Sequence, residues 1–135
     1  MNIFYLKTRG VMRKMNKEIY EKVELKIPEE WNVIYNKLLK VNLEKSEELN
    51  ENIWSELSED ILNIVNYKSN IVIDVGWYPE CSRNGHYGLV VIENNEWLRP
   101  VESLVTRNTN ELIEKIRMLL DKYKYKVDNE VLLLL

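Results

Sequence analysis

The sequence predicts an α+β fold, in which an antiparallel sheet of about four strands carries helices packed mainly on one face. Residues 71–107 contain three strand-like runs separated by short polar turns, and strands joined by tight turns pair antiparallel. Residues on both sides of this stretch show the spacing of amphipathic helices, which bury an apolar stripe against a sheet. Residues 23–27 alternate between apolar and charged side chains. The expected order is strand, helix, helix, three strands, helix.

The first half of the chain supplies the expected edge strand and two helices. Val23, Leu25 and Ile27 alternate with charged residues, which predicts a strand with one solvated face. Pro28 ends this strand and suits the first turn of a helix that continues to about residue 41. A second helix is expected over residues 46–66, with a break at residues 58–60. Helical spacing defines the two apolar stripes: Trp31, Ile34, Tyr35, Leu38 and Leu39, then Leu49, Ile53, Trp54, Leu57, Ile61, Leu62 and Val65.

Residues 71–107 predict the three consecutive strands. The Asn84-Gly85 pair is a strong hairpin signal, because both residues tolerate positive φ. Residues 90–92 are all apolar and β-branched, which indicates a central strand that is buried on both faces. Pro100 cannot donate to a strand ladder, so the third strand is expected to be an edge, to be bulged, or to begin after the proline.

The last predicted helix follows Arg107. Asn108 is a suitable N-cap with Glu111 three residues later, and Glu111 and Lys115 have the spacing of an ion pair. The apolar face comprises Leu112, Ile113, Ile116, Leu119, Leu120 and Tyr123. Residues 125–135 are open to three interpretations: a short strand, a segment docked on the core, or an exposed apolar end. We expect residues 1–18 to be a weakly structured extension and residues 19–135 to form one domain.

Composition and charge narrow the class of protein. The chain has 135 residues, of which 45% are hydrophobic and 30% charged, with one cysteine and a net charge of −3. Its longest apolar run, residues 131–135, is far shorter than the roughly 20 residues of a membrane helix, and no secretory signal is evident. We therefore expect a cytoplasmic protein without membrane contact.

Residues 44–60 concentrate acidic side chains against the single base Lys45. Such a surface disfavours direct contact with nucleic acid and would attract a basic partner. The alternative is a solvated helix face without a binding role. The acidic residues of this stretch are Glu44, Glu47, Glu48, Glu51, Glu56, Glu59 and Asp60.

One constellation has the residue types needed for catalysis. Cys81 and His86 flank the predicted turn, with Asp74 and Glu80 nearby, and a thiol beside an imidazole is the minimum for a nucleophilic pair. The spacing matches no known metal site, and the chain has no second histidine. We therefore expect no enzyme activity, no cofactor and no metal. The alternative is a small hydrolase or thiol enzyme that uses Cys81, His86 and Asp74.

Aromatic residues near the predicted strand ends have two interpretations. Trp77, Tyr78 and Trp97 either pack in the core or form a binding patch together with arginines such as Arg83. Tryptophan, tyrosine and arginine are the residue types that dominate binding energy at protein interfaces.

Four segments then suggest a family. Residues 71–80 read IVIDVGWYPE, residues 85–89 read GHYGL, residues 97–100 read WLRP, and Thr106-Arg107 precede a helix. These segments resemble small bacterial immunity proteins of contact-dependent growth inhibition and related polymorphic toxin systems. The resemblance runs from about residue 27 to residue 123, and residues 74–80 are its most specific part.

The resemblance implies a role without catalysis. Such a protein binds the toxic C-terminal domain of a cognate effector in the cytoplasm and covers its active site or an adjacent surface; many of these toxins are nucleases. The expected contact residues are Glu47, Glu48, Glu51, Trp77, Tyr78, Glu80, Arg83 and Trp97. A module that binds another protein, or a second copy of itself through residues 131–135, is a further alternative, and the oligomeric state stays open.

Overall fold

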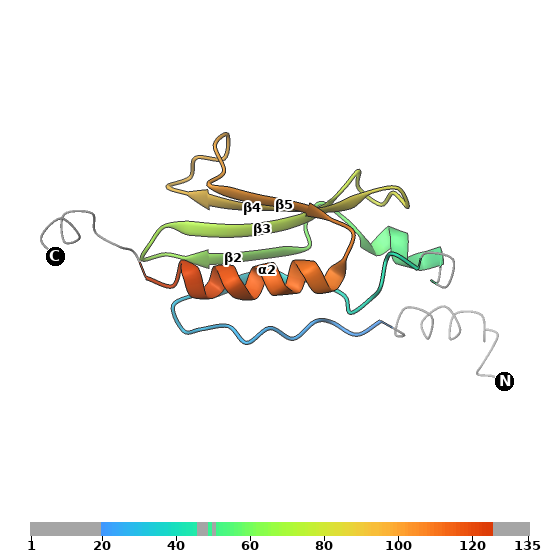
Figure 1. The fold of residues 1–135 in the computed structure, drawn as a ribbon, viewed down its shortest axis with the longest axis horizontal. Helices are drawn as coiled ribbons and strands as arrows, with labels where there is room; N and C mark the ends of the chain where they lie inside the picture. Colours follow the sequence, from blue (N-terminus) through green and yellow to red (C-terminus); the bar gives the residue numbers. More distant parts are fainter. Residues whose placement is uncertain (1–19, 46–48, 50, 126–135) are drawn as a thin grey trace, which may run out of the picture.

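A computed structural model of the chain describes residues 20–45, 49 and 51–125 (Figure 1). It contains a five-stranded antiparallel sheet in which each strand pairs with the next along the chain. The α+β class is confirmed, with five strands where four were expected. The elements are β1 (Asn32–Asn36), the 3-10 helix η2 (Glu51–Glu56), β2 (Leu62–Asn66), β3 (Ile71–Tyr78), β4 (His86–Glu93), β5 (Glu102–Thr106) and α2 (Thr109–Lys122).

The helix expected after Pro28 is wrong, because this segment forms the edge strand β1. Trp31, just before the strand, and Leu38, shortly after it, are both buried, and their separation of seven residues matches the spacing of a helical stripe. The Trp31 indole N–H donates to the Leu120 carbonyl at 2.9 Å, so this residue packs against α2. β-branched Val33 and Ile34 favour extended backbone, and the register with β2 shifts at this point. Long-range pairing therefore overrides the local pattern.

The prediction of a helix over residues 46–66 is also wrong. Residues 46–48 and 50 lie outside the described residues, and the rest divides into η2 and β2. The break at residues 58–60 is present, where the Asp60 amide donates to Ser58 Oγ at 3.1 Å. In β2, Leu62, Ile64 and Asn66 are buried and the residues between them are partly exposed, which is the two-residue period of a strand.

The edge strand expected at residues 23–27 is not a strand. An isolated bridge joins the preceding Lys22 to Leu39, and the Val23 amide donates to the Leu38 carbonyl at 2.8 Å. The segment runs beside α2 in Figure 1, and Val23 is buried in the core.

The three strands expected within residues 71–107 are confirmed. β4 lies between β3 and β5, and its neighbouring residues Val91 and Ile92, which face opposite sides, are both buried. β5 is an edge that begins after Pro100. The prediction of a tight turn at Asn84-Gly85 is wrong, because residues 79–85 form a longer loop. Among the described residues, positive φ occurs at Asn70 before β3, at Cys81 in this loop, and at Asn94 and Asn95 after β4.

The helix α2 matches its prediction closely. Asn108 accepts a hydrogen bond from the Glu111 amide at 2.9 Å, as an N-cap should. The expected pair between Glu111 and Lys115 is replaced by other partners, because Lys115 reaches Glu102 on β5. All the expected apolar residues of the helix face before Tyr123 are buried: Leu112, Ile113, Ile116, Leu119 and Leu120.

The two faces of the sheet differ. The inner face packs with α2, η2 and residues 20–45 around one core, and its residues Ile64, Ile73 and Leu89 are at most 1% exposed. On the outer face, Asn63 and Asp74 are only partly buried. The predicted N-terminal extension and the 126–135 tail lie outside the described residues. Within the described part, no helix is long and apolar enough to span a membrane.

Candidate functional site

Two of the predicted contact residues meet at one end of the sheet. The Arg83 guanidinium forms an ion pair with Glu51 and lies over the Trp54 ring, 5.5 Å from its centroid. Glu80 is exposed in the same 79–85 loop. Glu47 and Glu48, the other acidic residues of this prediction, lie outside the described residues.

Trp77 lies in the core, where it cannot contact a partner from the surface. It is 0% exposed, and its indole N–H donates to the Ser82 carbonyl at 2.7 Å. Its ring meets the edge of Tyr87 at 5.1 Å, and the Arg107 guanidinium covers it at 5.4 Å. These contacts correspond to the packing interpretation of this tryptophan.

Trp97 is exposed but isolated from the other predicted contact residues. It is 49% exposed in the β4–β5 loop, beside Leu98 at 98%. That loop is joined to the β2–β3 turn by a hydrogen bond from the Asn94 amide to the Asn70 carbonyl at 3.0 Å. Figure 1 shows it at the opposite end of the sheet from the 79–85 loop.

The structure gives the thiol and the imidazole separate partners. The Cys81 thiol lies 3.7 Å from the Ser55 carbonyl oxygen, whereas His86 Nδ1 lies 3.3 Å from the Tyr87 carbonyl oxygen. Asp74 is bound to Asn63 instead. Within the described residues, no group of three or more His, Cys, Asp or Glu has the arrangement of a metal site.

The outer face of the sheet gathers a different set of residues, which we call the acid–tyrosine cluster: Tyr35, Asp60, Asn63, Asp74 and Tyr78. The strand register places Tyr35 opposite Asn63 and Asn63 opposite Asp74, across β1, β2 and β3. The Tyr35 hydroxyl donates to Asp60 at 3.3 Å, and the Asn63 amide donates to Asp74 at 2.9 Å. Three strands and the segment before β2 therefore contribute to one surface.

Asp60 owes its position to the segment that precedes β2. This segment continues alongside β3, because the Trp77 amide donates to the Ser58 carbonyl at 2.9 Å and the Ile61 amide to the Val75 carbonyl at 3.0 Å. Between these contacts, Ser58 Oγ bonds both the amide and the carbonyl of Asp60 at 3.1 Å. The turn carries the Asp60 carboxylate to the hydroxyl of Tyr35.

The cluster brings two carboxylates near each other, and Lys37 lies over the Tyr35 ring, 5.5 Å from its centroid. Burial, followed by the nearby Asp60 charge, raises the pKa of Asp74 above its usual value, although the hydrogen bond from Asn63 opposes this. Burial and the charges of Asp74 and Asp60 raise the pKa of Tyr35 to about 12. Within the described part of the chain, neither Asp60 nor Asp74 forms an ion pair. Such a surface favours a positively charged ligand.

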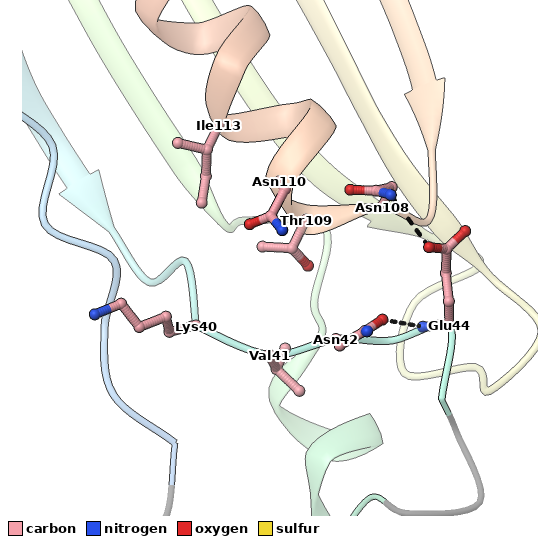
Figure 2. Close-up of a pocket in the computed structure, with 8 residues that line it drawn as sticks. All are labelled: Lys40, Val41, Asn42, Glu44, Asn108, Thr109, Asn110 and Ile113. Atoms are coloured by element: carbon pink, nitrogen blue, oxygen red, sulfur yellow. Dashed lines mark hydrogen bonds between the residues drawn. The ribbon is translucent and has the colours of Figure 1, made fainter.

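A cavity of about 250 Å³ lies at the start of α2, but several of its polar groups already bond to one another or to the core (Figure 2). Asn108 donates to Glu44 at 3.1 Å, and Asn42 accepts from the Glu44 amide at 3.0 Å. Thr109 Oγ1 lies 3.2 Å from the Tyr87 hydroxyl. We therefore place the candidate site at the acid–tyrosine cluster. The cavity is lined by Lys40, Val41, Asn42, Glu44, Asn108, Thr109, Asn110 and Ile113.

Comparisons of the chain with protein-family models, with curated proteins and with solved structures found no match. The site therefore stands on its geometry. Sequence reasoning included Tyr78 among the contact residues and considered Asp74 as an acid. Asp60 belongs to the acidic stretch that was expected to attract a basic partner. Sequence reasoning missed Tyr35 and Asn63 as surface partners, because their strands were interpreted as helices. The polar Asn63 between apolar Leu62 and Ile64 was the signal that could have placed it on a solvated sheet face.

Proposed function

We propose that this protein is an immunity protein, which binds the toxic C-terminal domain of a contact-dependent inhibition effector in the cytoplasm and neutralises it without catalysis. The observation that carries the proposal is the acid–tyrosine cluster on the outer face of the sheet, whose carboxylates Asp60 and Asp74 form no ion pair with any described residue. The sequence resemblance of residues 71–107 supplies the class of partner.

The chemistry of the cluster fits protein binding. Its carboxylates would be neutralised by lysine or arginine side chains of a partner, and opposite charges speed encounter and fix orientation. Tyrosine contributes apolar area together with a hydroxyl group, which suits an interface core. A toxin with a basic substrate groove, such as a nuclease, presents the matching charge. Glu51 of η2 and the residues Glu80 and Arg83 of the 79–85 loop would form the rim of such an interface.

The test is co-expression with the toxin domain encoded immediately upstream, scored by cell survival and by co-purification. We expect rescue and a stable one-to-one complex. Failure of the unaltered protein to rescue or to bind would reject the proposed function. Binding without rescue would instead indicate a protein-binding module of another kind.

Matched charge reversals locate the contact surface. Asp60→Lys alters one exposed side chain at the cluster, whereas Glu96→Lys alters one exposed side chain on the distant β4–β5 loop, with the same change in net charge. We expect the first variant to lose rescue and the second to keep it, with thermal melting showing that both are folded. Equal rescue by both would show that the partner binds elsewhere.

A further inference from the structure

Tyr78 lies flat against the backbone of two strands. A side chain at Gly76 would clash with the Glu59 carbonyl and would place its first carbon 2.6 Å from the Tyr78 hydroxyl oxygen. A side chain at Gly88, opposite Gly76 on β4, would place its first carbon 3.1 Å from Tyr78 Cδ2. The ring therefore depends on glycine at both positions, in the way that an aromatic residue covers a cross-strand glycine.

The other side of the ring faces solvent, since Tyr78 is 39% exposed. Its hydroxyl end is directed along β3 towards Gly76 and the acidic residues. Burial, and after it the charges of Asp74, Glu59 and Asp60, raise the pKa of Tyr78. A ring face and carboxylates are thus presented together.

Neighbouring aromatic rings already show what occupies such a position. Lys37 lies over Tyr35 at 5.5 Å from the ring centroid, and Arg83 over Trp54 at 5.5 Å. Arg107 covers Trp77 at 5.4 Å. Among the described residues, no lysine or arginine lies over Tyr78, which is close to the carboxylates of Asp74, Glu59 and Asp60. A cationic side chain of a partner would fit this ring face and these carboxylates.

We propose that Tyr78, Asp60 and Asp74 bind an arginine side chain of the protein partner, with the guanidinium stacked on the ring and hydrogen-bonded to the carboxylates. Arginine suits the geometry better than lysine, because its planar group stacks on an aromatic face while its several N–H donors reach more than one carboxylate. This inference rests on the proposed function only for the identity of the partner as a toxin domain.

The test uses peptides in place of the unknown partner. A ten-residue acetylated peptide with three arginines spaced by Gly-Ser is titrated into the full chain, and the backbone amides of Gly76 and Gly88 and the Asn63 side-chain amide are followed by NMR. Versions with lysine or with uncharged citrulline at the same positions are the controls. We expect the arginine peptide to bind more tightly than the lysine peptide and the citrulline peptide not to bind.

Variants separate the ring from the charges. Tyr78→Phe keeps the ring and should retain the arginine affinity, whereas Tyr78→Leu should weaken it about 2- to 5-fold, as expected for an exposed cation–π contact. Asp74→Asn should weaken it about 10-fold, and Glu96→Gln on the distant loop should not change it. Equal binding of the arginine and lysine peptides, unaffected by Tyr78→Leu, would overturn the proposal and indicate diffuse attraction.

The peptide result and the co-expression result can fail independently. If a toxin domain is neutralised but the peptide does not shift the Gly76 and Gly88 amides, the arginine site is wrong and the immunity function stands. If the peptide binds at the cluster but no toxin is neutralised, the arginine site stands and its partner belongs to another class.

Discussion

Two carboxylates on the same sheet, Glu102 and Asp74, have pKa values shifted in opposite directions. Glu102 on β5 accepts hydrogen bonds from Lys115 Nζ at 2.9 Å, Lys122 Nζ at 2.6 Å and the Tyr123 hydroxyl at 2.5 Å. These partners lower the pKa of Glu102 to about 2. Asp74 on β3 accepts a side-chain hydrogen bond from one described residue, Asn63, and its pKa is raised by burial.

The difference separates a folding role from a binding role. The Glu102 cluster (Glu102, Lys115, Lys122 and Tyr123) joins β5 to the middle and the C-terminal end of α2, so its charges are satisfied within the chain. In the acid–tyrosine cluster, the partly buried Asp74 carboxylate forms no ion pair with any described residue, which costs stability. Proteins retain such costs mainly where function requires them. Stability measurements should therefore respond in opposite directions at the two clusters.

The largest effect is expected from Glu102→Gln. The change removes the charge that three donors share, and hydrogen bonds to charged groups contribute about 2 kcal/mol to stability. The free energy of unfolding, measured in urea at pH 7, should fall by that amount. Glu96→Gln, an exposed control in the β4–β5 loop, should change it little. A fall below about 0.5 kcal/mol for Glu102→Gln would show that the cluster is not structural.

The second prediction concerns acid stability. The pKa of Glu102 is lowered from 4.5 to about 2, so its stabilisation is fully present above pH 4.5 and is lost as pH falls towards 2. The difference in unfolding free energy between the unaltered protein and Glu102→Gln should therefore shrink through this window. Urea titrations at pH 7, 5, 4 and 3 would measure it. A difference that does not change with pH would contradict the lowered pKa.

The third prediction has the opposite sign. The pKa of Asp74 is raised above 3.8, so ionisation weakens the folded state as pH rises, and neutral Asn at this position avoids that cost. Asp74→Asn should stabilise the protein by about 0.5 to 1 kcal/mol at pH 7 and should weaken its binding to the partner. The gain should vanish at acidic pH, where Asp74 itself is protonated. Lower stability at pH 7 would mean that its charge serves the fold.

The success of sequence reasoning follows the range of the interactions. The Asn108 cap and the apolar face of α2 were predicted because each depends on residues within one or two helical turns. β1 and β2 were missed because Trp31 and Leu38 reach the core from the ends of a strand, and only pairing with residues 62–66 reveals this. The acid–tyrosine cluster was missed for the same reason, because the register of β1 with β2 and of β2 with β3 brings its strand residues together.

The smallest effects are expected at Glu51, a predicted contact residue that we compare with Asp60. Its ion pair with Arg83 is exposed, with the two side chains 81% and 50% accessible, so Glu51→Gln should change stability by less than about 1 kcal/mol. Because Arg83 already neutralises Glu51 and nothing in the described chain neutralises Asp60, Asp60→Asn should weaken partner binding more than Glu51→Gln does. Affinities of the two variants for the same toxin domain, measured by calorimetry, decide this. A greater loss for Glu51→Gln would indicate that the partner binds at η2 and the 79–85 loop instead of the outer face of the sheet.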